Sequence, residues 1–495
     1  MSRLYSVSDV RRAEQHAVES GIPEYDLMLN AGRQAADLIN FHYPEAVRFL
    51  IFCGGGNNGG DALVAAAVLH TRYHREVIVY ALKPLNKLVG CAAFAATGLP
   101  ETVEVRDAAE FKVQDIHPGD VIVDGILGIG FNGGALRPET AELIAVINSS
   151  RCPVAALDLP SGMDGDSGSV SPDGVINADL TICFGMLKSG LFSAEGSRFR
   201  GKLRLADIGL EAGECSGVEV FANTDAVSSA AVPGFDCHKN SRGRVLIWGG
   251  SDEYPGAPVL SAVAALRCGA GIVRLVSEGE CSRTAPAELI VKKIPNGSAL
   301  AREVVPFFSL SDVLAAGCGW GSRIAVEALD IVKSFPGKVV LDADALNMFS
   351  RNPEKWQFKN NLIITPHPGE AGRLAEAFHL KPCRDRRELA IELARRLHCV
   401  VLLKGRDSIV ASPDGRNTVI ASGNHALATA GSGDVLTGII AALLASGNLP
   451  LFEAAALGGF IHGIAGESAA GIPLAGDLPE LAGRVLAALR CNSII

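Results

Sequence analysis

An acidic residue stands at the start of the most aliphatic stretch of the chain. Residues 424–447 read NHALATAGSGDVLTGIIAALLASG, so that Gly431, Ser432 and Gly433 directly precede Asp434. The N-terminus of a helix presents unpaired N–H groups and a positive dipole end, and glycines let an anion approach them closely. This pattern predicts a phosphate site, with Asp434 placed to take a proton from the group that attacks the phosphate. The alternative is that Ser432 or Asp434 is only an N-cap, the commoner role of such residues.

A glycine-rich turn in the first half carries amide and carboxylate side chains. The segment CGGGNNGGDALVAAAVLH, residues 53–70, follows an apolar run and matches G-x-G-x-x-G. A dinucleotide-binding turn also needs an acidic residue about 20 positions onward, and the next apolar run, EVIVYALKPLN, ends without one. Asn57, Asn58 and Asp61 therefore indicate a hydrogen-bonded ligand or an oxygen-coordinated cation. A glycine turn with an asparagine cap is the alternative.

Charged residues also follow three further apolar runs. Asp124 ends DVIVD, Asp158 ends VAALD, and Lys188 follows CFGML. In an open parallel sheet, ligands bind outside the carboxyl ends of the strands, so we expect these side chains to converge on one crevice. A single acid behind a strand is more often a helix cap, but this succession favours a pocket.

The elements that position these residues follow an α/β pattern. Short β-branched runs alternate with longer alanine-rich segments, which predicts parallel sheets in two α/β domains. A mixed, poorly periodic segment near residues 220–235 predicts the boundary between domains at residues 1–220 and 230–495. The expected strands lie in residues 48–54, 76–82, 120–126 and 152–159, and then in 244–250, 271–277, 338–344, 361–367 and 399–405.

Composition limits the class of protein. The chain has 495 residues, 48% of them hydrophobic and 20% charged, as in globular proteins. A formal charge of −9 argues against nucleic acid or a membrane surface as partner, because both are polyanionic. The 12 cysteines are scattered and form no C-x-x-C, so we expect reduced thiols. The charged start and the absence of a long apolar stretch predict a cytoplasmic protein.

Four motifs of the first half carry a family resemblance. GGGNNGGDA, DGILGIGFNG, DLPSGMDGDSG and FGMLKSGL, in this order within residues 1–215, resemble the NAD(P)H-hydrate epimerase domain. The resemblance implies a Rossmann-like fold that interconverts the R and S epimers of hydrated NADH or NADPH. It implies catalysis by Asp158 or Lys188, either of which is a candidate base, and potassium held by Asn58, Asp124 and Ser161. It also implies substrate contacts at Asn57, Asn58, Gly59, Gly60, Asp61, Gly128, Ile129, Gly130, Phe131, Asn132, Gly133, Gly134 and Asp158.

Six motifs of the second half carry another resemblance. GRVLIWGGSDEYPGAPVLSAVAALRCGAGIV, GCGWGS, DADALN, ITPHPGE, LLKGRDSIV and the segment at 424–447 resemble the ADP- or ATP-dependent NAD(P)H-hydrate dehydratase, a ribokinase-like α/β fold. The resemblance implies that Asp434 is the base that activates the hydroxyl of the hydrate, with magnesium accompanying ADP or ATP. It implies nucleotide contacts at Lys404, Gly405, Arg406, Asp407, Ser408, Gly431, Ser432 and Gly433. It implies substrate contacts at Ala257, Gly319, His367 and Asp434.

Some residues depart from these patterns or allow another interpretation. Ala62 replaces an expected glycine and Ser189 a common proline, and neither change removes a polar group. Cys318 and Trp320 depart from the usual form of the GCGWG segment and put the role of Gly319 in doubt. His367, between two prolines, is either a substrate contact or a capped turn residue.

Taken together, the motifs resemble the bifunctional NAD(P)H-hydrate repair enzymes. The expected partners are small molecules, namely the hydrated dinucleotides and ADP or ATP, and we expect a homo-oligomer. The chain lacks G-x-x-x-x-G-K-[ST], so a P-loop kinase is excluded on the motif. The alternative is a ribokinase-like vitamin kinase fused to a non-catalytic Rossmann-like scaffold.

Overall fold

The computed structural model divides the chain into two compact units. It describes residues 2–193, 195–211, 218–221, 223–230, 238–282, 284–295, 299–358, 360–383, 385–446, 449–469 and 471–491. Residues 3–218 form the N-terminal unit, and residues 219–495 with the first two residues form the C-terminal unit. Part of the boundary segment expected at 220–235, namely residues 222 and 231–235, lies outside the described residues.

The N-terminal unit is built on a seven-stranded parallel sheet in the order β4-β3-β2-β5-β6-β7-β9. The strands are β2 (Arg48–Cys53), β3 (Glu76–Ala81), β4 (Glu104–Asp107), β5 (Asp120–Gly125), β6 (Val154–Leu157), β7 (Leu180–Phe184) and β9 (Lys202–Ala206). The first strand of this sheet, β2, lies in its interior. Strands β3 and β4 are added on one side of β2, and β5, β6, β7 and β9 on the other. The order reverses between β2 and β5, which is where Rossmann-like sheets bind ligands.

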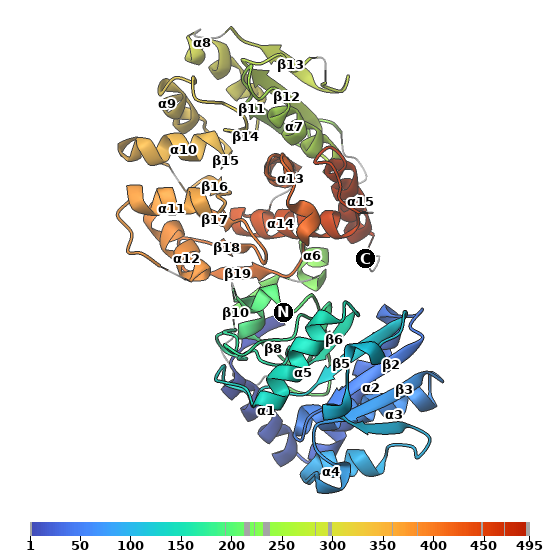
Figure 1. Cartoon of the computed structure of the whole chain (residues 1–495). Coiled ribbons are helices and arrows are strands. Elements are labelled where there is room, and N and C mark those ends of the chain that lie inside the picture. The colour runs from blue at the N-terminus through green and yellow to red at the C-terminus, as the bar shows by residue number, and fades with distance from the viewer. Residues whose placement is uncertain are drawn as a thin grey trace. The chain divides into compact units, whose positions relative to one another are not determined.

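Alternating side chains bury both faces of this sheet. In β2, Phe49 and Ile51 belong to one apolar core, whereas Leu50 and Phe52 belong to the other. This two-residue period follows from strand geometry and makes both faces of the sheet apolar, so helices cover both faces. Helices α2 (Glu24–His42), α3 (Asn57–Thr71) and α4 (Gly90–Thr97) pack on the first face, and α5 (Pro138–Ser149) packs on the second (Figure 1).

A short parallel pair fixes the start of the chain beside Lys188. Strand β1 (Ser2–Tyr5) pairs with β8 (Leu187–Lys188), and Tyr5 lies opposite Lys188. The Ser189 hydroxyl donates to the Tyr5 carbonyl at 3.1 Å. Helix α1 (Val7–Glu19) follows directly, capped by Ser6.

The C-terminal unit contains a larger mixed sheet. Its strands follow the order β13-β12-β11-β14-β15-β16-β17-β18-β19-β10, parallel from β13 to β17 and antiparallel between β17, β18 and β19. The strands are β10 (Val218–Phe221), β11 (Arg244–Trp248), β12 (Ile272–Ser277), β13 (Ile290–Lys293), β14 (Val313–Ala316), β15 (Lys338–Leu341), β16 (Leu362–Ile364), β17 (Val400–Leu403), β18 (Ile409–Ala411) and β19 (Asn417–Ile420). The order reverses between β11 and β14.

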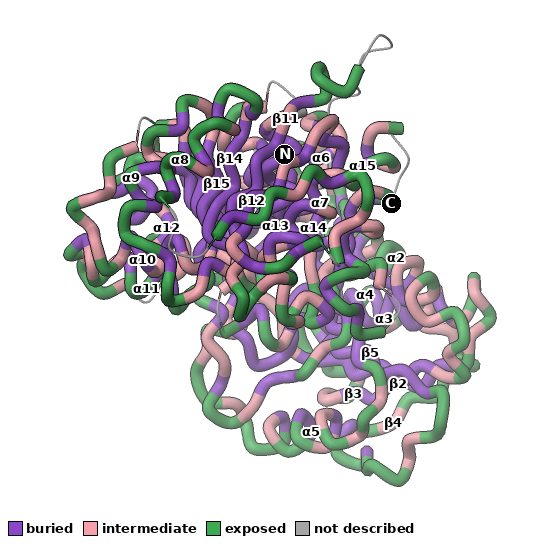
Figure 2. Tube along the Cα trace, turned by 90° about the horizontal axis from the view of Figure 1, so that it is seen from above, coloured by how far each residue is buried: buried purple, intermediate pink, exposed green. Residues whose placement is uncertain are grey.

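Helices cover both faces of the second sheet, as Figure 1 shows. A large apolar core joins one face to α7 (Ala257–Arg267), α13 (Ser432–Ser446), α14 (Leu451–Glu467) and α15 (Leu478–Arg490). The other helices are α6 (Asn223–Ser229), α8 (Leu300–Val304), α9 (Glu327–Ser334), α10 (Asp344–Arg351), α11 (Pro368–Ala377) and α12 (Arg386–Leu397). Figure 2 shows the central strands of the sheets, such as β2, β5, β14 and β15, as mostly buried.

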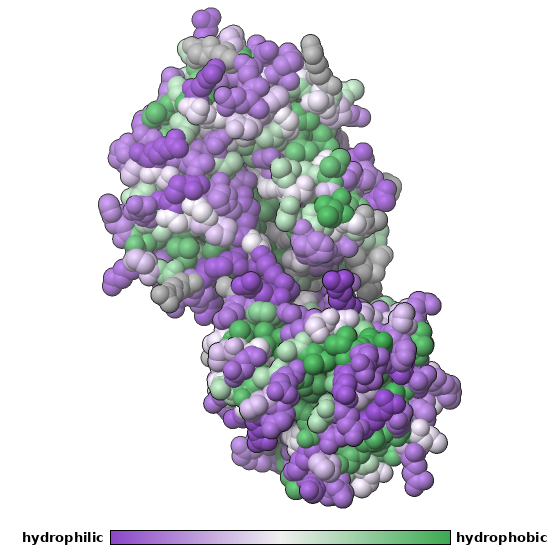
Figure 3. Space-filling view, in the orientation of Figure 1, coloured by the Kyte–Doolittle hydropathy of each residue, from purple (hydrophilic) through white to green (hydrophobic). Residues whose placement is uncertain are grey.

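The predicted fold class is confirmed, and all nine expected strands form. The strands that were not expected are mostly short and weakly periodic, such as β4 at a sheet edge and the four-residue β14. None of the helices in the described ranges combines the length and apolar character of a bilayer span. Hydrophilic residues cover much of the face seen in Figure 3.

Candidate functional site

A cavity of about 1620 Å³ lies at the carboxyl ends of the strands of the N-terminal unit. Its wall brings together many of the expected residues, because the turns after β2, β5 and β6 meet where the strand order reverses. Among them are Asn57, Asn58, Asp61, Gly128, Ile129, Gly130, Phe131, Asp158 and Lys188. The expected contacts Gly59, Gly60, Asn132, Gly133 and Gly134 are not part of this wall.

Lys188 and Asp158 form a buried ion pair in the cavity wall. The Lys188 Nζ lies 2.5 Å from Asp158 Oδ1 and 2.9 Å from the Phe184 carbonyl oxygen. Burial lowers the pKa of Lys188, but the adjacent Asp158 carboxylate outweighs it and holds the pKa above its usual value. Asp158 has a φ of 62°, a sparsely populated region that its pairing with β7 maintains. The pair is therefore a preorganised charged centre.

Asp61 faces the same cavity without a partner of its own. It lies in the second turn of α3 and is 9% exposed. Within the described ranges, no hydrogen bond or ion pair engages its carboxyl group. Burial raises the pKa of Asp61 well above its usual range, and the charges of Asp158 and Glu14 raise it further. Asp61 is therefore suited to donate a hydrogen bond as a neutral acid.

The three residues expected to hold potassium meet below the cavity. Asp124 accepts hydrogen bonds from the Ser161 amide at 2.8 Å and the Ser161 hydroxyl at 2.6 Å. The Asn58 Nδ2 donates to the carbonyl oxygens of Leu127 and Leu157, which orients the amide and leaves the buried Oδ1 without a partner. An unsatisfied amide oxygen beside a buried carboxylate and a hydroxyl fits a hard cation.

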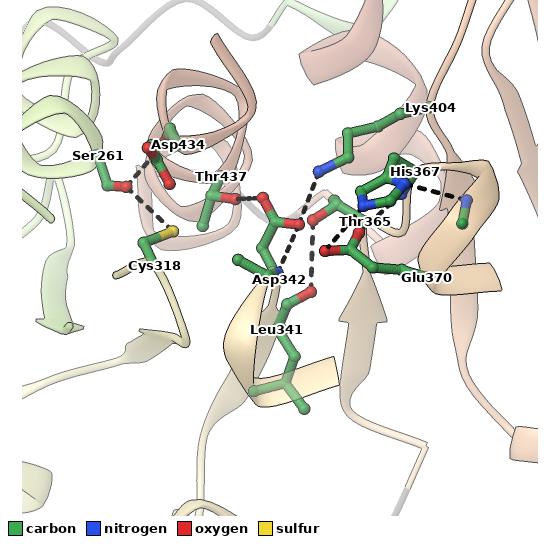
Figure 4. A network of polar contacts seen from close by, with 12 residues as sticks. Ser261, Cys318, Leu341, Asp342, Thr365, His367, Glu370, Lys404, Asp434 and Thr437 are labelled. Carbon is green, nitrogen blue, oxygen red and sulfur yellow. Dashed lines mark hydrogen bonds and ion pairs between the residues drawn. The ribbon is translucent and has the colours of Figure 1, made fainter. Parts of the chain in front are cut away.

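In the C-terminal unit, Asp342 is the centre of a polar network (Figure 4). It follows β15 and accepts from the Lys404 Nζ at 2.7 Å and the Thr437 hydroxyl at 3.0 Å. The amide of Ala343 also donates to it at 2.8 Å, with Ala343 at a φ of 51°. Burial lowers the pKa of Lys404, but Asp342 outweighs this and raises it. Lys404, at the end of β17, is therefore a fixed cation.

Asp434 is a carboxylate near Asp342 that forms no ion pair with a lysine among the described residues. It lies in the first turn of α13, and in the described part of the chain no backbone N–H donates to its side chain. Its pKa is raised to about 7, mainly by burial and then by the like charge of Asp342, although a hydrogen bond with Cys318 and the charge of Lys404 oppose this. The Ser261 hydroxyl donates to its backbone carbonyl at 2.8 Å, tying α13 to α7. The structure thus gives Asp434 no capping bond.

The glycines before Asp434 are required by close approach. A Cβ at Gly433 would lie 3.1 Å from the Lys404 Nζ, and Gly431 has a φ of 92°. Ser432, between them, directs its hydroxyl to Nε2 of His462 at 3.1 Å instead of capping the helix. Burial lowers the pKa of His462 to about 4, so this ring is neutral. The start of α13 therefore combines bare amides with an adjacent ammonium group.

The loop from Lys404 to Ser408 is held from α12. Arg386 donates to the carbonyl oxygens of Arg406 at 2.7 Å and Lys404 at 3.2 Å. Ser408 donates to the carbonyl oxygen of Gly405 at 3.0 Å. Of the expected nucleotide contacts, Lys404 and Gly433 lie close together, while the rest of this loop forms the turn between the antiparallel strands β17 and β18.

The expected substrate contacts of the C-terminal unit fall into two groups. A Cβ at Gly319 would lie 3.0 Å from that of Ala257, so these two residues are neighbours. Trp320 is buried against Trp248, which explains how this bulky residue is accommodated beside Gly319. His367 accepts from the Gly369 amide at 3.0 Å and caps α11, the alternative that the sequence left open, although half of its ring stays exposed.

Sequence reasoning missed several residues of these sites. Asp342 ends an apolar run just as Asp124 and Asp158 do, so the same rule could have found it. Cys318 stands out in the sequence only as a departure from the usual form of the GCGWG segment, and Thr437 follows Asp434 by three residues in α13. Ser261 and His462 carry no local signal, because each reaches the site from another helix. Glu14 is another such residue, since it lines the N-terminal cavity from α1.

Comparisons with known proteins cover both units. The family described as YjeF-related protein N-terminus matches residues 24–190, and the family described as NAD(P)H-hydrate dehydratase matches residues 245–487. The bifunctional NAD(P)H-hydrate repair enzyme Nnr of Coxiella burnetii is 35% identical over 95% of this chain and 95% of that protein. Its namesake in Escherichia coli is 34% identical over 94% of this chain and 89% of that protein.

One solved structure with a related name is the ADP/ATP-dependent NAD(P)H-hydrate dehydratase from Bacillus subtilis, co-crystallized with ATP/Mg²⁺. It is 28% identical, covers 55% of this chain and 99% of its own, and superposes with a TM-score of 0.47.

Proposed function

Because the chain belongs to the family of bifunctional NAD(P)H-hydrate repair enzymes, we propose that it converts hydrated NADH and NADPH back to NADH and NADPH in two steps. Residues 1–220 interconvert the R and S epimers of the hydrate. Residues 230–495 dehydrate the S epimer at the expense of ADP or ATP. The observation that carries the proposal is Asp434, a half-buried carboxylate with a pKa of about 7 beside a bare helix start and a fixed lysine.

Dehydration needs a better leaving group than hydroxide. Asp434, as carboxylate, takes the proton of the hydrate's hydroxyl, and the oxygen attacks the terminal phosphorus of the nucleotide. The new O–P bond forms as the bond to the shortened nucleotide breaks. Loss of phosphate and of a ring proton then restores the dihydropyridine. The pKa of about 7 supports this role, because a base works best near the operating pH.

The start of α13 provides the charge that phosphoryl transfer requires. The amides of Gly431, Ser432 and Gly433 donate to the phosphate oxygens, and the ammonium group of Lys404 offsets the developing charge. Gly405, Arg406, Asp407 and Ser408 complete the nucleotide contacts. Ala257, Gly319 and His367 contact the hydrate. Magnesium would be held mainly by the nucleotide phosphates.

Epimerisation uses the cavity of the N-terminal unit. Asp158 and Lys188 exchange protons with the hydrate, and the residues of the glycine-rich turns at 57–61 and 128–134 hold the dinucleotide. Asn58, Asp124 and Ser161 bind potassium, which would supply a fixed positive charge beneath the substrate. The orphan Oδ1 of Asn58 supports this assignment. We also propose that the protein acts in the cytoplasm as a homo-oligomer.

The decisive experiment supplies the purified protein with hydrated NADH, magnesium and ADP or ATP. Return of dihydronicotinamide absorbance, with release of phosphate, is the expected result. Consumption of nucleotide with a stable phosphorylated product would instead identify a small-molecule kinase. Residues 236–495 alone should dehydrate the S epimer and leave the R epimer, and equal rates on both would refute the division between the units.

A further inference from the structure

Glu14 reaches the cavity of the N-terminal unit from α1, whereas Asp61 lies in α3, Asp158 follows β6 and Lys188 lies in β8. Helix α1 buries Val7, Val10, Ala13 and Ala17 along one stripe, and Glu14 lies at the edge of that stripe, half-buried. Its side chain lines the same cavity as Asp61, Asp158 and Lys188.

The position of α1 is fixed by contacts around the catalytic centre. The Val7 amide donates to Asp166 Oδ1 at 2.6 Å, and Arg11 donates to the Ile129 carbonyl oxygen at 3.3 Å. The β1–β8 pair places Tyr5, two residues before α1, opposite Lys188. Glu14 is therefore held by the same strand pair that positions the buried lysine.

The charges in the cavity are unequal in number. Lys188 is a single buried ammonium group and is engaged by Asp158. Burial raises the pKa of Glu14, the Asp158 charge raises it further, and Lys188 and Arg11 oppose this. The charge of Glu14 in turn acts on both Lys188 and Asp61. Glu14 thus interacts electrostatically with both Asp158 and Lys188 but forms no ion pair with Lys188.

Inverting a carbon that carries a hydroxyl group requires proton transfer on both faces of the ring. One acid must protonate the departing oxygen, and one base must deprotonate the water that returns on the other face. The Asp158–Lys188 pair comes from the strand ends, whereas Glu14 lines the same cavity from α1, so the cavity holds a second ionisable group on a separate element.

We propose that Glu14 is the second acid–base residue of the epimerisation centre and acts on the hydrate from α1 while the Asp158–Lys188 pair acts from the strand ends. The inference rests on the epimerase function proposed above. In one direction the Glu14 carboxyl group gives its proton to the hydroxyl, and the C–O bond breaks with its electron pair leaving on water. The ring nitrogen stabilises the resulting cation.

The second half of the reaction uses the other group. A water molecule adds to the opposite face and forms the new C–O bond, and the Asp158–Lys188 pair takes its proton. Glu14 has then lost one proton and the Asp158–Lys188 pair has gained one, and solvent restores both to their starting states. In the reverse direction the pair gives the proton and Glu14 takes it. Asp61 lines the same cavity, and burial together with the charges of Asp158 and Glu14 raises its pKa.

The test compares Glu14→Gln with Glu142→Gln, an exposed glutamate of α5 that does not line the cavity. Both variants are assayed as the whole protein for epimerisation across pH, for dehydration of the S epimer, and for melting temperature. Glu14→Gln should lower the kcat of epimerisation about 10²- to 10⁴-fold, as loss of a general acid or base does, with little change in KM. Dehydration and melting temperature should match those of Glu142→Gln.

The pH profile separates a catalytic role from a structural one. Glu14 is faced by Asp158, Lys188, Arg11 and Glu24, all of which remain in the variant. The wild-type profile of kcat should therefore lose one limb in Glu14→Gln and regain it, at a lower rate, in Glu14→Asp. Normal kcat in Glu14→Gln, an unchanged profile, or a loss accompanied by a lower melting temperature and no recovery in Glu14→Asp would overturn the inference. Absence of epimerisation by the wild-type protein would instead overturn the proposed function.

Discussion

Each unit pairs a lysine with an aspartate near the carboxyl ends of parallel strands, but among the described residues the two pairs leave different carboxyl groups without a lysine partner. In the N-terminal unit, Lys188 and Asp158 are both almost fully buried, with side chains 1% and 10% exposed. In the C-terminal unit, Lys404 is 20% exposed and its partner Asp342 is 2% exposed. Both pairs adjoin a left-handed backbone position, at Asp158 itself and at Ala343.

This difference matches two kinds of chemistry. The N-terminal pair is itself the proposed proton-transfer group, so its members must face the substrate together. In the C-terminal unit the pair holds a cation in place for the proposed phosphate site, and the proposed base is the separate Asp434. A lysine bound to an aspartate can therefore serve either as an acid–base centre or as a fixed positive charge, and the neighbouring unpaired carboxyl groups decide which.

The largest expected effect comes from removing the separate base. Asp434→Asn keeps the size and the N-cap preference of the side chain, so folding, nucleotide affinity and epimerisation should be normal. Dehydration should fall about 10²- to 10⁴-fold, roughly 3 to 5.5 kcal/mol of barrier. Steady-state rates of both reactions and the ADP dissociation constant measure this on one protein. Near-normal dehydration would return Asp434 to an incidental role.

The two lysines should differ in their contribution to stability. Lys188→Met leaves the buried Asp158 with no counter-ion and, among the described residues, only the Phe184 amide as donor, at 3.3 Å, and breaking a buried ion pair typically costs about 3 to 5 kcal/mol of unfolding free energy. Lys404→Met should cost less, because Asp342 keeps the Thr437 hydroxyl and the Ala343 amide as donors. Urea unfolding of each unit, with the exposed Lys87→Met as control, measures the difference. Equal losses would mean that the two pairs are equivalent.

Dehydration should depend on pH through Asp434. The base must be ionised, so the rate should fall about tenfold for each pH unit below the pKa of about 7 and level off above it. Asp434→Asn should lack this inflection. Rates of dehydration of the S epimer between pH 5 and 9, expected to span about two orders of magnitude, provide the test. A flat profile would show that another group accepts the proton.

Potassium should act on one unit alone. Replacing it by choline should slow epimerisation and lower the unfolding free energy of the N-terminal unit, by about 2.7 kcal/mol if potassium was present at a hundred times its dissociation constant. ADP binding should not change. Ser161→Ala, which removes one proposed oxygen ligand, should weaken the response to potassium. A response of equal size in the C-terminal unit would contradict the site.

The smallest effect is expected at His462. His462→Phe removes the partner of the Ser432 hydroxyl, and a neutral hydrogen bond contributes about 1 kcal/mol. Dehydration should slow by roughly fivefold through a higher KM for nucleotide, with the melting temperature little changed. A loss as large as that of Asp434→Asn would give His462 a direct part in the chemistry.

The sequence by itself determined the α/β class, the strands, and the polar residues that follow them. These features are local, since burial alternates along a strand and the N–H groups of a helix start are unpaired wherever the helix lies. The Gly431–Asp434 turn and the residues Asp124, Asp158 and Lys188 could therefore be read directly. The same rule would have found Asp342, which directly follows the apolar run KVVL.

Only the tertiary structure decided which of these residues meet and in what protonation state. Lys404 reaches Asp342 across 62 positions, and His462 reaches Ser432 across 30. Glu14 is one of several charged residues in an amphipathic helix, and the β1–β8 pair is what brings that helix beside Lys188. The pKa of Asp434 rises to about 7 because packing removes water from its carboxyl group and places Asp342 nearby. Burial and charge pairing depend on which distant elements pack together, and a local pattern of residues does not specify that packing.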